Sequence, residues 1–409
     1  MSGGLGTACY GLTKAMSSLG TEIVFVLPKT GDADYSSHIK MLSAEGFILA
    51  EELRKFKNVH FRTISSPLRP YVPSASYEGY KKKGEGNCVR TWQCDSSKNP
   101  QTYGRDIYEQ VHRYAEKVEE IASVEDFDVI HAHDWMTYPA AVAVAQASCK
   151  PLVVHVHSTE FDRSGENINQ VIYDIERHGM HIADRVVAVS NYTKNIIMNR
   201  YGLSPNKVEV VYNGVEDNNN SDHSHPVPNK SSKIVLFLGR ITMQKGPEYF
   251  IAAAKKVLEK ISNVKFVMAG DGDMTHRMIE YAAWLGIGHK VFFTRFLRGD
   301  DVTKAYRLAD LYVMPSVSEP FGIAALEALR HNVPVLISKQ SGVSETLKNV
   351  LKVDFWDINQ MANKIAAVLK HSPLSKTLRE NGLAETELFR WENSAAKVNR
   401  IYKQLLACA

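Results

Sequence analysis

Short apolar runs rich in β-branched residues alternate with amphipathic helical patterns from one end of the chain to the other. Most of these runs are apolar throughout rather than at every second position, which is typical of strands buried on both faces of a parallel sheet. The pattern therefore predicts an α/β fold in which helices cover parallel sheets on both faces. The expected strands lie at residues 23–27, 129–131, 152–156, 186–189, 208–211, 234–238, 264–269, 291–294, 311–314 and 333–337, and the clearest helices at 7–19, 106–123, 247–260, 274–285 and 357–370.

One stretch with almost no apolar residues divides this alternation into two halves. Residues 217–232, DNNNSDHSHPVPNKSS, are rich in turn formers, a composition typical of linkers. We therefore expect two Rossmann-like domains, the first at 1–216 and the second at 233–388, each of ordinary domain size. A second irregular stretch at 65–103 is expected to form a long loop or subdomain within the first half.

The chain opens on a glycine-rich segment, Ser2-Gly3-Gly4-Leu5-Gly6, that leads directly into a helical pattern. In a Rossmann-like domain such a loop follows the first strand, and no strand pattern precedes it here. We therefore expect the first domain to lack its first strand. Its absence would leave backbone groups of two strands unpaired, unless another segment fills the gap.

Bulk composition excludes several classes of protein. The chain is 44% hydrophobic and 23% charged, as expected of a soluble globular protein. A net charge of +4 spread over 409 residues does not indicate a nucleic-acid partner. No apolar run approaches the length of a transmembrane helix. The five cysteines form neither a disulfide framework nor a metal-ligand spacing, which indicates a reduced, cytoplasmic protein.

The most informative motif is SEPFGIAALE at residues 318–327, which follows an apolar strand and opens a helix. Glu319 falls in the loop at the carboxyl end of that strand, where ligands of open α/β sheets bind, and Glu327 falls within the helix. The amides at the helix start, those of Phe321, Gly322 and Ile323, could bind sugar hydroxyls and phosphate oxygens. Gly322 would let a ligand approach the backbone. Two solvated glutamates at a helix start would have the same spacing.

Two basic residues follow another apolar strand. The strand at 234–238 delivers Arg240 to its carboxyl end, and Lys245 comes just before the next helix. Two fixed cations beside a helix N-terminus can hold a diphosphate and stabilise it as it departs. The glycines of the opening segment, Gly3 and Gly4, would likewise let backbone amides face phosphate. Each of these signals is weak in isolation.

Two histidine pairs end neighbouring strands, His131 with His133 and His155 with His157. Alternate residues of a strand share a face, so either pair could bind a metal ion. The sequence shows no third ligand, and we expect no metal site. Instead, His157 is expected to reach a sugar hydroxyl, and His133, Asp134 and Trp135 are expected to line the acceptor side. The D-x-D sequence at 271–273 follows a buried strand and is expected to be a turn rather than a metal ligand.

Together these motifs resemble glycosyltransferase family 4 and the related glycogen and starch synthases. The resemblance rests on GGLG at 3–6, HAHDW at 131–135, VHST at 156–159, GR…KG at 239–246, AGDGD at 269–273 and E-x₇-E at 319–327. It implies the GT-B architecture, in which two Rossmann-like domains face a cleft. It also implies that FRWE at 389–392 introduces a final helix, within 389–409, that crosses back to brace the first domain.

The resemblance further implies how a nucleotide-sugar donor is bound. Gly3 and Gly4 would contact the donor phosphates, Arg240 and Lys245 would clamp the diphosphate, and Glu327 would bind the ribose hydroxyls. No metal ion or other cofactor is then needed to neutralise the diphosphate.

The sugar and the base have their own positions in this scheme. Glu319 would hold the hexose together with the amides of the following helix, and His157 would touch its outer hydroxyl. The base would pack against the main chain of Arg295, Phe296 and Leu297. The residues expected to carry the reaction are Glu319, His157, Arg240 and Lys245. Such enzymes retain the anomeric configuration.

The expected activity is transfer of a hexose from UDP-glucose or ADP-glucose to a glycan, as in elongation of an α-1,4-glucan. Met1 stands where bacterial glycogen synthases usually have lysine, and Thr7 where they commonly have aspartate. Three alternatives stay open: a family 4 transferase for a cell-surface polysaccharide or a sucrose-phosphate-type product, a non-catalytic binder of nucleotide sugars or glycans, and a nucleotide-sugar epimerase.

Overall fold

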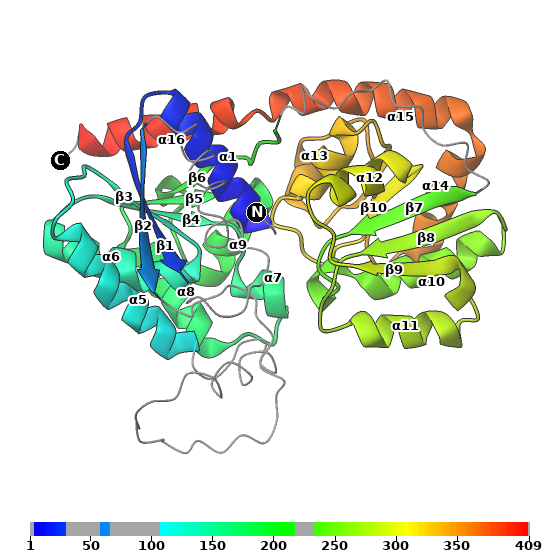
Figure 1. The fold of residues 1–409 in the computed structure, drawn as a ribbon, viewed down its shortest axis with the longest axis horizontal. Helices are drawn as coiled ribbons and strands as arrows, with labels where there is room; N and C mark the ends of the chain where they lie inside the picture. The colour runs from blue at the N-terminus through cyan, green and yellow to red at the C-terminus, as the bar shows by residue number, and fades with distance from the viewer. Residues whose placement is uncertain (1–3, 30–57, 66–106, 217–231, 408–409) are drawn as a thin grey trace, which may run out of the picture.

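A computed structural model describes residues 4–29, 58–65, 107–216 and 232–407, which form two lobes side by side (Figure 1). Gly3, most of the expected linker at 217–232 and nearly all of the irregular stretch at 65–103 lie outside the described residues. In the part of the chain that is described, no helix is long and apolar enough to cross a membrane.

The first lobe contains two parallel sheets, one of strands β1 and β2 and one in the order β3-β4-β5-β6. Its elements are α1 (Gly4–Ser18), β1 (Ile23–Lys29), β2 (Val59–Ser65), α5 (Ile107–Ala122), β3 (Ile130–His133), η1 (Trp135–Thr137), α6 (Tyr138–Ser148), β4 (Leu152–Val156), α7 (Glu160–Ser164), α8 (Gln170–Ile182), β5 (Arg185–Ala188), α9 (Asn191–Tyr201), η2 (Pro205–Lys207) and β6 (Val208–Val210). Among the described residues no strand joins β1 to β3.

The second lobe is built on one parallel sheet in the order β12-β11-β10-β7-β8-β9. Its elements are β7 (Lys233–Leu238), η3 (Met243–Lys245), α10 (Pro247–Leu258), β8 (Val264–Ala269), α11 (Thr275–Trp284), η4 (Gly288–Lys290), β9 (Val291–Arg295), α12 (Asp300–Leu308), β10 (Leu311–Met314), α13 (Ile323–Arg330), β11 (Val335–Ser338), η5 (Gly342–Glu345), β12 (Leu351–Val353), α14 (Ile358–Lys370) and α15 (Ser372–Glu385). This is the doubly wound order of dinucleotide-binding domains, so the predicted fold class is confirmed.

The predicted strands are confirmed, with ends that differ by at most two residues. Every residue of β4, β10 and β11 is buried, as their mainly apolar sequences predict. The strand β2 was not predicted. Its sequence, VHFRTIS, contains no continuous apolar run, because the exposed polar residues His60 and Arg62 interrupt it. The short strand β12 was missed for a similar reason, because polar Lys352 interrupts it.

The last helices connect the two lobes. Helix α15 packs on α13 and α14 of the second lobe, and α16 (Trp391–Leu406) runs along the same edge onto α1 of the first (Figure 1). The Thr21 hydroxyl donates to Asn399 Oδ1 over 3.1 Å. The Trp391 ring, 5% exposed, lies against Gly11 in the middle of α1.

Substitution of Gly11 tests this contact, because two effects oppose each other there. Alanine in a helix interior is favoured over glycine by about 1 kcal/mol. A Cβ at Gly11, however, would lie 2.2 Å from Cε2 of the buried Trp391 ring. Overpacking typically costs about 1–3 kcal/mol, so we expect Gly11→Ala to lower the free energy of unfolding in urea titrations.

Gly288→Ala is the matched control, because a Cβ there would meet its nearest atom at an ordinary 3.7 Å. That variant should unfold close to the wild type. A Gly11→Ala protein as stable as wild type, or more stable, would show that α16 does not press on α1 as described.

Candidate active site

The loops after β7 and β10 lie side by side, because these two strands are neighbours although they are far apart in sequence. This pair is where the strand order reverses, and ligands of open α/β sheets bind at such a switch point. Arg240 follows β7, Lys245 ends η3, and Glu319 lies in the loop after β10. The sheet therefore gathers the three predicted charged residues at one position.

Lys245 and Glu319 form an ion pair. Lys245 Nζ lies 2.6 Å from Glu319 Oε2, and the Ser316 hydroxyl donates to the same oxygen over 3.1 Å. Glu319 is only 8% exposed, and its backbone is fixed by pairing with Ser341 beside β11. Replacement of Lys245 would leave the buried Glu319 carboxylate without its cationic partner, which is energetically costly.

Arg240 is held by the turn that follows it. Its Nη2 donates to Gln244 Oε1 over 3.3 Å, and Gln244 is itself buried. The Gln244 carbonyl accepts the amide of Val317 over 2.9 Å. Arg240, η3 and the loop carrying Glu319 are therefore one connected unit.

Helix α13 begins after Gly322, as predicted. The Gly322 φ of 111° is in the region that side chains rarely adopt, and a Cβ would meet Met314 Cε at 2.9 Å. Backbone conformation and core packing therefore both require a glycine here. The amides of Phe321, Gly322 and Ile323 make no described hydrogen bond.

Glu327 points from α13 toward α12. The Tyr306 hydroxyl donates to Glu327 Oε2 over 3.0 Å, and burial raises the pKa of the carboxyl group. One carboxyl oxygen is thus engaged by the protein itself. The segment predicted to meet the base begins at the end of β9, where Arg295 has φ 60° and its carbonyl accepts the amide of Gly270.

The first lobe contributes the loop after β4. Asp134 Oδ1 accepts the amides of His157, over 2.7 Å, and Ser158, over 3.3 Å. Asp134 has φ 60°, a strained value for a residue with a side chain, and burial raises its pKa to about 7. Its neighbour Trp135 is 2% exposed within the core, so the prediction that Trp135 lines the acceptor side is wrong.

The two predicted histidine pairs form one stack, because β3 and β4 are adjacent and His133 is in register with His155. His131 and His133 lie 4.5 Å apart between ring centroids, and His155 and His157 lie 4.3 Å apart. His133 Nδ1 and His157 Nε2 share a hydrogen bond of 2.9 Å. Burial lowers the pKa of both His133 and His157 to about 3, so both rings are neutral.

A third potential metal ligand, which the sequence did not show, lies beside this stack. Cys9 of α1 places its sulfur within 4.8 Å of ring nitrogens of His133 and His157. By contrast, the D-x-D sequence at 271–273 is a turn, as predicted. Asp271 Oδ1 accepts the Gly272 amide over 2.9 Å and the Thr275 hydroxyl over 3.0 Å.

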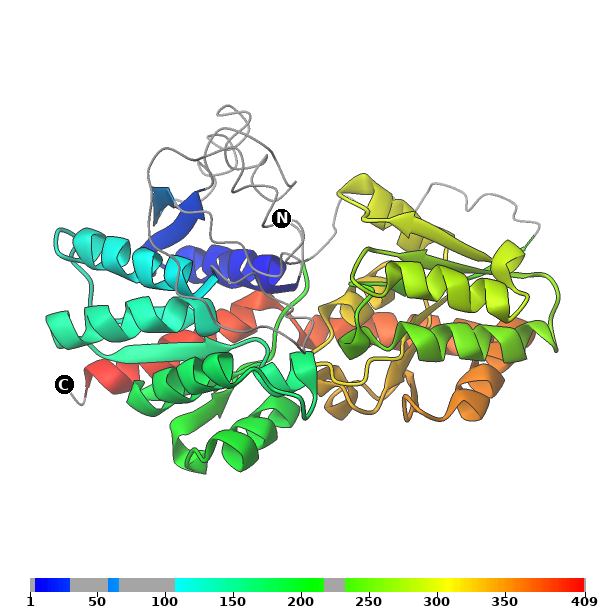
Figure 2. The ribbon, with the colours of Figure 1, turned by 90° about the horizontal axis from the view of Figure 1, so that it is seen from below.

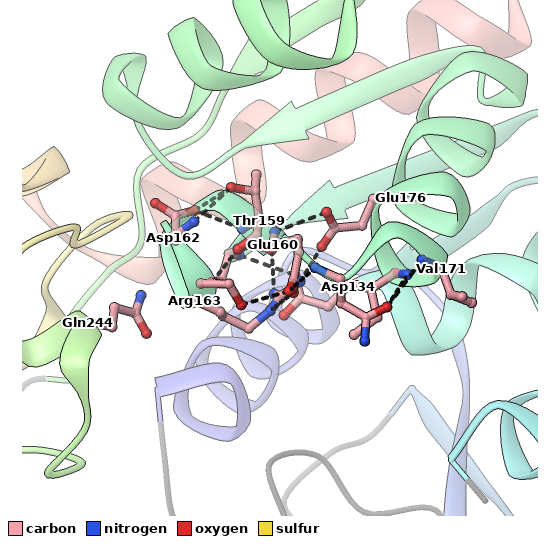
Figure 3. A network of polar contacts seen from close by, with 12 residues as sticks. Asp134, Thr159, Glu160, Asp162, Arg163, Val171, Glu176 and Gln244 are labelled. Carbon is pink, nitrogen blue, oxygen red and sulfur yellow. Dashed lines mark hydrogen bonds and ion pairs between the residues drawn. The ribbon is translucent and has the colours of Figure 1, made fainter. Parts of the chain in front are cut away.

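A buried charge network fixes the loop that carries His157 (Figure 3). Arg163 donates to Glu160 over 3.1 Å and to Glu176, and all three side chains are almost fully buried. Thr159 caps α7 through reciprocal hydrogen bonds with Asp162. Burial raises the pKa values of Asp162 and Glu176. Sequence reasoning did not identify this network.

Ser318 connects the network to the second lobe. Its hydroxyl donates to Asp162 Oδ1 over 2.5 Å and lies 3.0 Å from the Tyr192 hydroxyl. The Ser190 hydroxyl donates to the Pro320 carbonyl over 2.6 Å. The loop around Glu319 is therefore clamped by residues 126 to 156 positions earlier in the chain. No local pattern could have revealed these contacts.

Comparison with known proteins agrees with this geometry. Residues 218–384 match the family described as "Glycosyl transferases group 1", and residues 94–219 match "Glycosyltransferase Family 4". An uncharacterized glycosyltransferase of Methanocaldococcus jannaschii is 34% identical over 302 residues, which cover 69% of this chain and 77% of that protein. The protein is a nucleotide-sugar-dependent transferase. More particularly, the chain belongs to glycosyltransferase family 4.

The chain is also similar, at lower sequence identity, to proteins with named activities. The glycogen synthase of Mycobacterium tuberculosis is 27% identical over 289 residues, 67% of this chain and 68% of that protein. Sucrose-phosphate synthase of Thermosynechococcus elongatus superposes with a TM-score of 0.68 at 20% identity, over 95% of this chain and 100% of that one. Anabaena HepE in complex with UDP and glucose superposes with a TM-score of 0.66 at 16% identity, over 94% and 100%. These structures establish the shared GT-B fold.

Removing the Ser318 hydroxyl tests the clamp between the lobes. A hydrogen bond to a charged group contributes about 1.5–3 kcal/mol, and each 1.4 kcal/mol is about tenfold in an equilibrium. We expect Ser318→Ala to shift the protein toward separated lobes and to increase its radius of gyration in small-angle X-ray scattering.

Ser344→Ala is the control, since the Ser344 hydroxyl donates only to the carbonyls of Lys339 and Ser341 in the same lobe. Its scattering should match the wild type. If Ser318→Ala also scatters like the wild type, the Ser318 contacts do not hold the lobes together.

Proposed function

We propose that this protein is a retaining glycosyltransferase that moves glucose from UDP-glucose or ADP-glucose to a glycan and elongates an α-1,4-glucan. The observation that carries the proposal is the convergence of Arg240, Lys245 and Glu319 at the switch point of the second lobe. The loop carrying His157 leads into α7, which contacts η3 across the junction. Similarity to a glycogen synthase supports the choice of a glucan.

In this proposal Arg240 and Lys245 hold the donor diphosphate. Both follow β7, and their positive charge stabilises the diphosphate as it leaves. The N-terminal end of α1 lies at the junction of the two lobes (Figures 1 and 2), so the amides around Gly4 face the phosphates with the positive end of the helix dipole. Gly3 has the same proposed role. Because two cations serve the diphosphate, we propose no metal or other cofactor for the reaction.

The hexose occupies the space between Glu319 and His157. Lys245 interacts with both the donor phosphate and Glu319. The second carboxylate oxygen of Glu319 accepts a hydrogen bond from a sugar hydroxyl. His157, a neutral imidazole, exchanges its hydrogen bond with His133 for one to the outer sugar hydroxyl. The amides of Phe321, Gly322 and Ile323 bind hydroxyls or phosphate oxygens at the start of α13.

The nucleoside lies along the outer side of α13. Glu327 binds the ribose hydroxyls with the oxygen that Tyr306 leaves available. The base packs against the main chain of Arg295, Phe296 and Leu297. The acceptor approaches from the first lobe, beside His133 and Asp134. The acceptor hydroxyl attacks on the face from which the diphosphate leaves, and a departing phosphate oxygen takes its proton, so no carboxylate nucleophile is needed.

The activity is tested with purified protein, UDP-glucose and ADP-glucose, each with and without glycogen. We expect nucleotide release with one donor and lengthening of the glucan only when glycogen is present. Nucleotide release with no lengthening would contradict the glucan acceptor, and sucrose-phosphate-type and polysaccharide acceptors would be tested next. Tight donor binding with neither release nor transfer would contradict catalysis, and interconversion of the donor sugars would indicate an epimerase.

Substitution of the buried ion pair tests the site. Loss of one contact that stabilises the transition state typically costs about 10²–10³-fold in turnover. We expect Glu319→Ala and Lys245→Ala each to lose at least that factor in kcat. The Lys339→Ala variant breaks a solvent-exposed ion pair with Asp354 and should keep full activity. Turnover near the wild-type value in Glu319→Ala and Lys245→Ala would refute these assignments.

A further inference from the structure

Cys9, His133 and His157 come from three separate elements and meet at one point. Cys9 lies on α1, His133 ends β3, and His157 follows β4. The sulfur and one ring nitrogen of each histidine all lie within 4.8 Å of one another. Zinc bonds of about 2.3 Å to sulfur and 2.0–2.1 Å to nitrogen imply ligand separations of about 3.3–3.6 Å in a tetrahedral site. Small side-chain movements therefore bring the three residues into ligating geometry.

A second observation points to a ligand at the same stack. His155 is 2% exposed, and neither of its ring nitrogens has a hydrogen-bond partner among the described residues. The buried Nε2 of His131 likewise has no described partner. A buried polar group left without a hydrogen-bond partner destabilises the folded protein. One ring nitrogen of His155 lies within 4.8 Å of nitrogens of His131 and His133, so His133 belongs to two overlapping groups of three ligands.

We propose that this protein binds one divalent transition-metal ion of the zinc type between Cys9, His133 and His157. A thiolate with two imidazoles favours zinc, cobalt, nickel or copper over magnesium, manganese or calcium. The thiol of Cys9 loses its proton to solvent when the metal binds. Three protein ligands leave one tetrahedral position open for water or a small ligand.

The site has a consequence for the transferase, which rests on the proposed function. His157 is the residue that the proposed function assigns to the outer hydroxyl of the hexose. An imidazole nitrogen that ligates a metal ion cannot bond to that hydroxyl, so the ion and the nucleotide sugar compete. Zinc is then an inhibitor of this protein, and inhibition depends on Cys9.

Cobalt titration of the metal-free full chain tests the site directly, because cobalt bound to a thiolate in a tetrahedral site absorbs strongly in the visible and near ultraviolet. We expect one equivalent to develop both bands in the wild type and one equivalent of zinc to remove them. Cys149→Ser, the matched control, replaces an exposed cysteine and should behave like wild type. Cys9→Ser should lose the near-ultraviolet thiolate band and at least about 100-fold in affinity.

His157→Gln provides a second test that does not depend on the cysteine. It should also weaken cobalt binding, and the thermal unfolding of each variant confirms that it is folded. A near-ultraviolet band that persists in folded Cys9→Ser, or a wild type that binds no cobalt, would overturn the site. Cobalt affinity unchanged in His157→Gln would overturn the assignment of that ligand.

Competition is measured as the zinc affinity in the presence and absence of UDP-glucose or ADP-glucose. A donor that binds should weaken zinc binding in the wild type. If a donor binds and the zinc affinity does not change, the competition is refuted. A Cys9-dependent cobalt spectrum in a protein that binds neither donor would support the metal site and refute the proposed function, so the two failures are distinguishable.

Discussion

The contact on which the site depends is the pairing of β7 with β10. Leu311 and Tyr312 of β10 are in register with Val235 and Leu236 of β7, although the strands are separated by two strand–helix units. Chain segments leave these two strands in opposite directions across the sheet, so their loops diverge and leave space for a ligand. The Lys245–Glu319 ion pair spans the two loops at that place. A substitution that separated β7 from β10 would therefore disrupt the site even if it replaced none of the site residues.

The first lobe depends on a different constraint, which is the burial of charge. Glu160, Glu176 and Arg163 are almost completely removed from solvent, and each carboxylate is hydrogen-bonded to the guanidinium. Buried ion pairs add little net stability, but removal of one partner is expensive. The network therefore acts as a rigid support. Through Asp162 it reaches Ser318, so the position of the loop around Glu319 is set from both lobes.

A glycogen synthase and a sucrose-phosphate synthase are both among the proteins similar to this chain. Fold similarity alone therefore does not identify the substrates of this chain. In the histidine stack, three buried ring nitrogens of His131 and His155 have no hydrogen-bond partner among the described residues. Polar groups buried without partners are the exception in native structures and call for a specific explanation.

The sequence by itself determined the α/β class, the strands and the carboxyl-end positions of Arg240, Lys245 and Glu319, because apolar runs and helix starts are local patterns. It missed β2, whose apolar residues are interrupted by the exposed His60 and Arg62, and it misplaced Trp135, which is a core residue. Only the tertiary structure brought Ser318 to Asp162 and Cys9 to His133 and His157. These contacts join residues more than a hundred positions apart, and what brings them together is the packing of the two lobes and of α1 on its sheet, which no local pattern records.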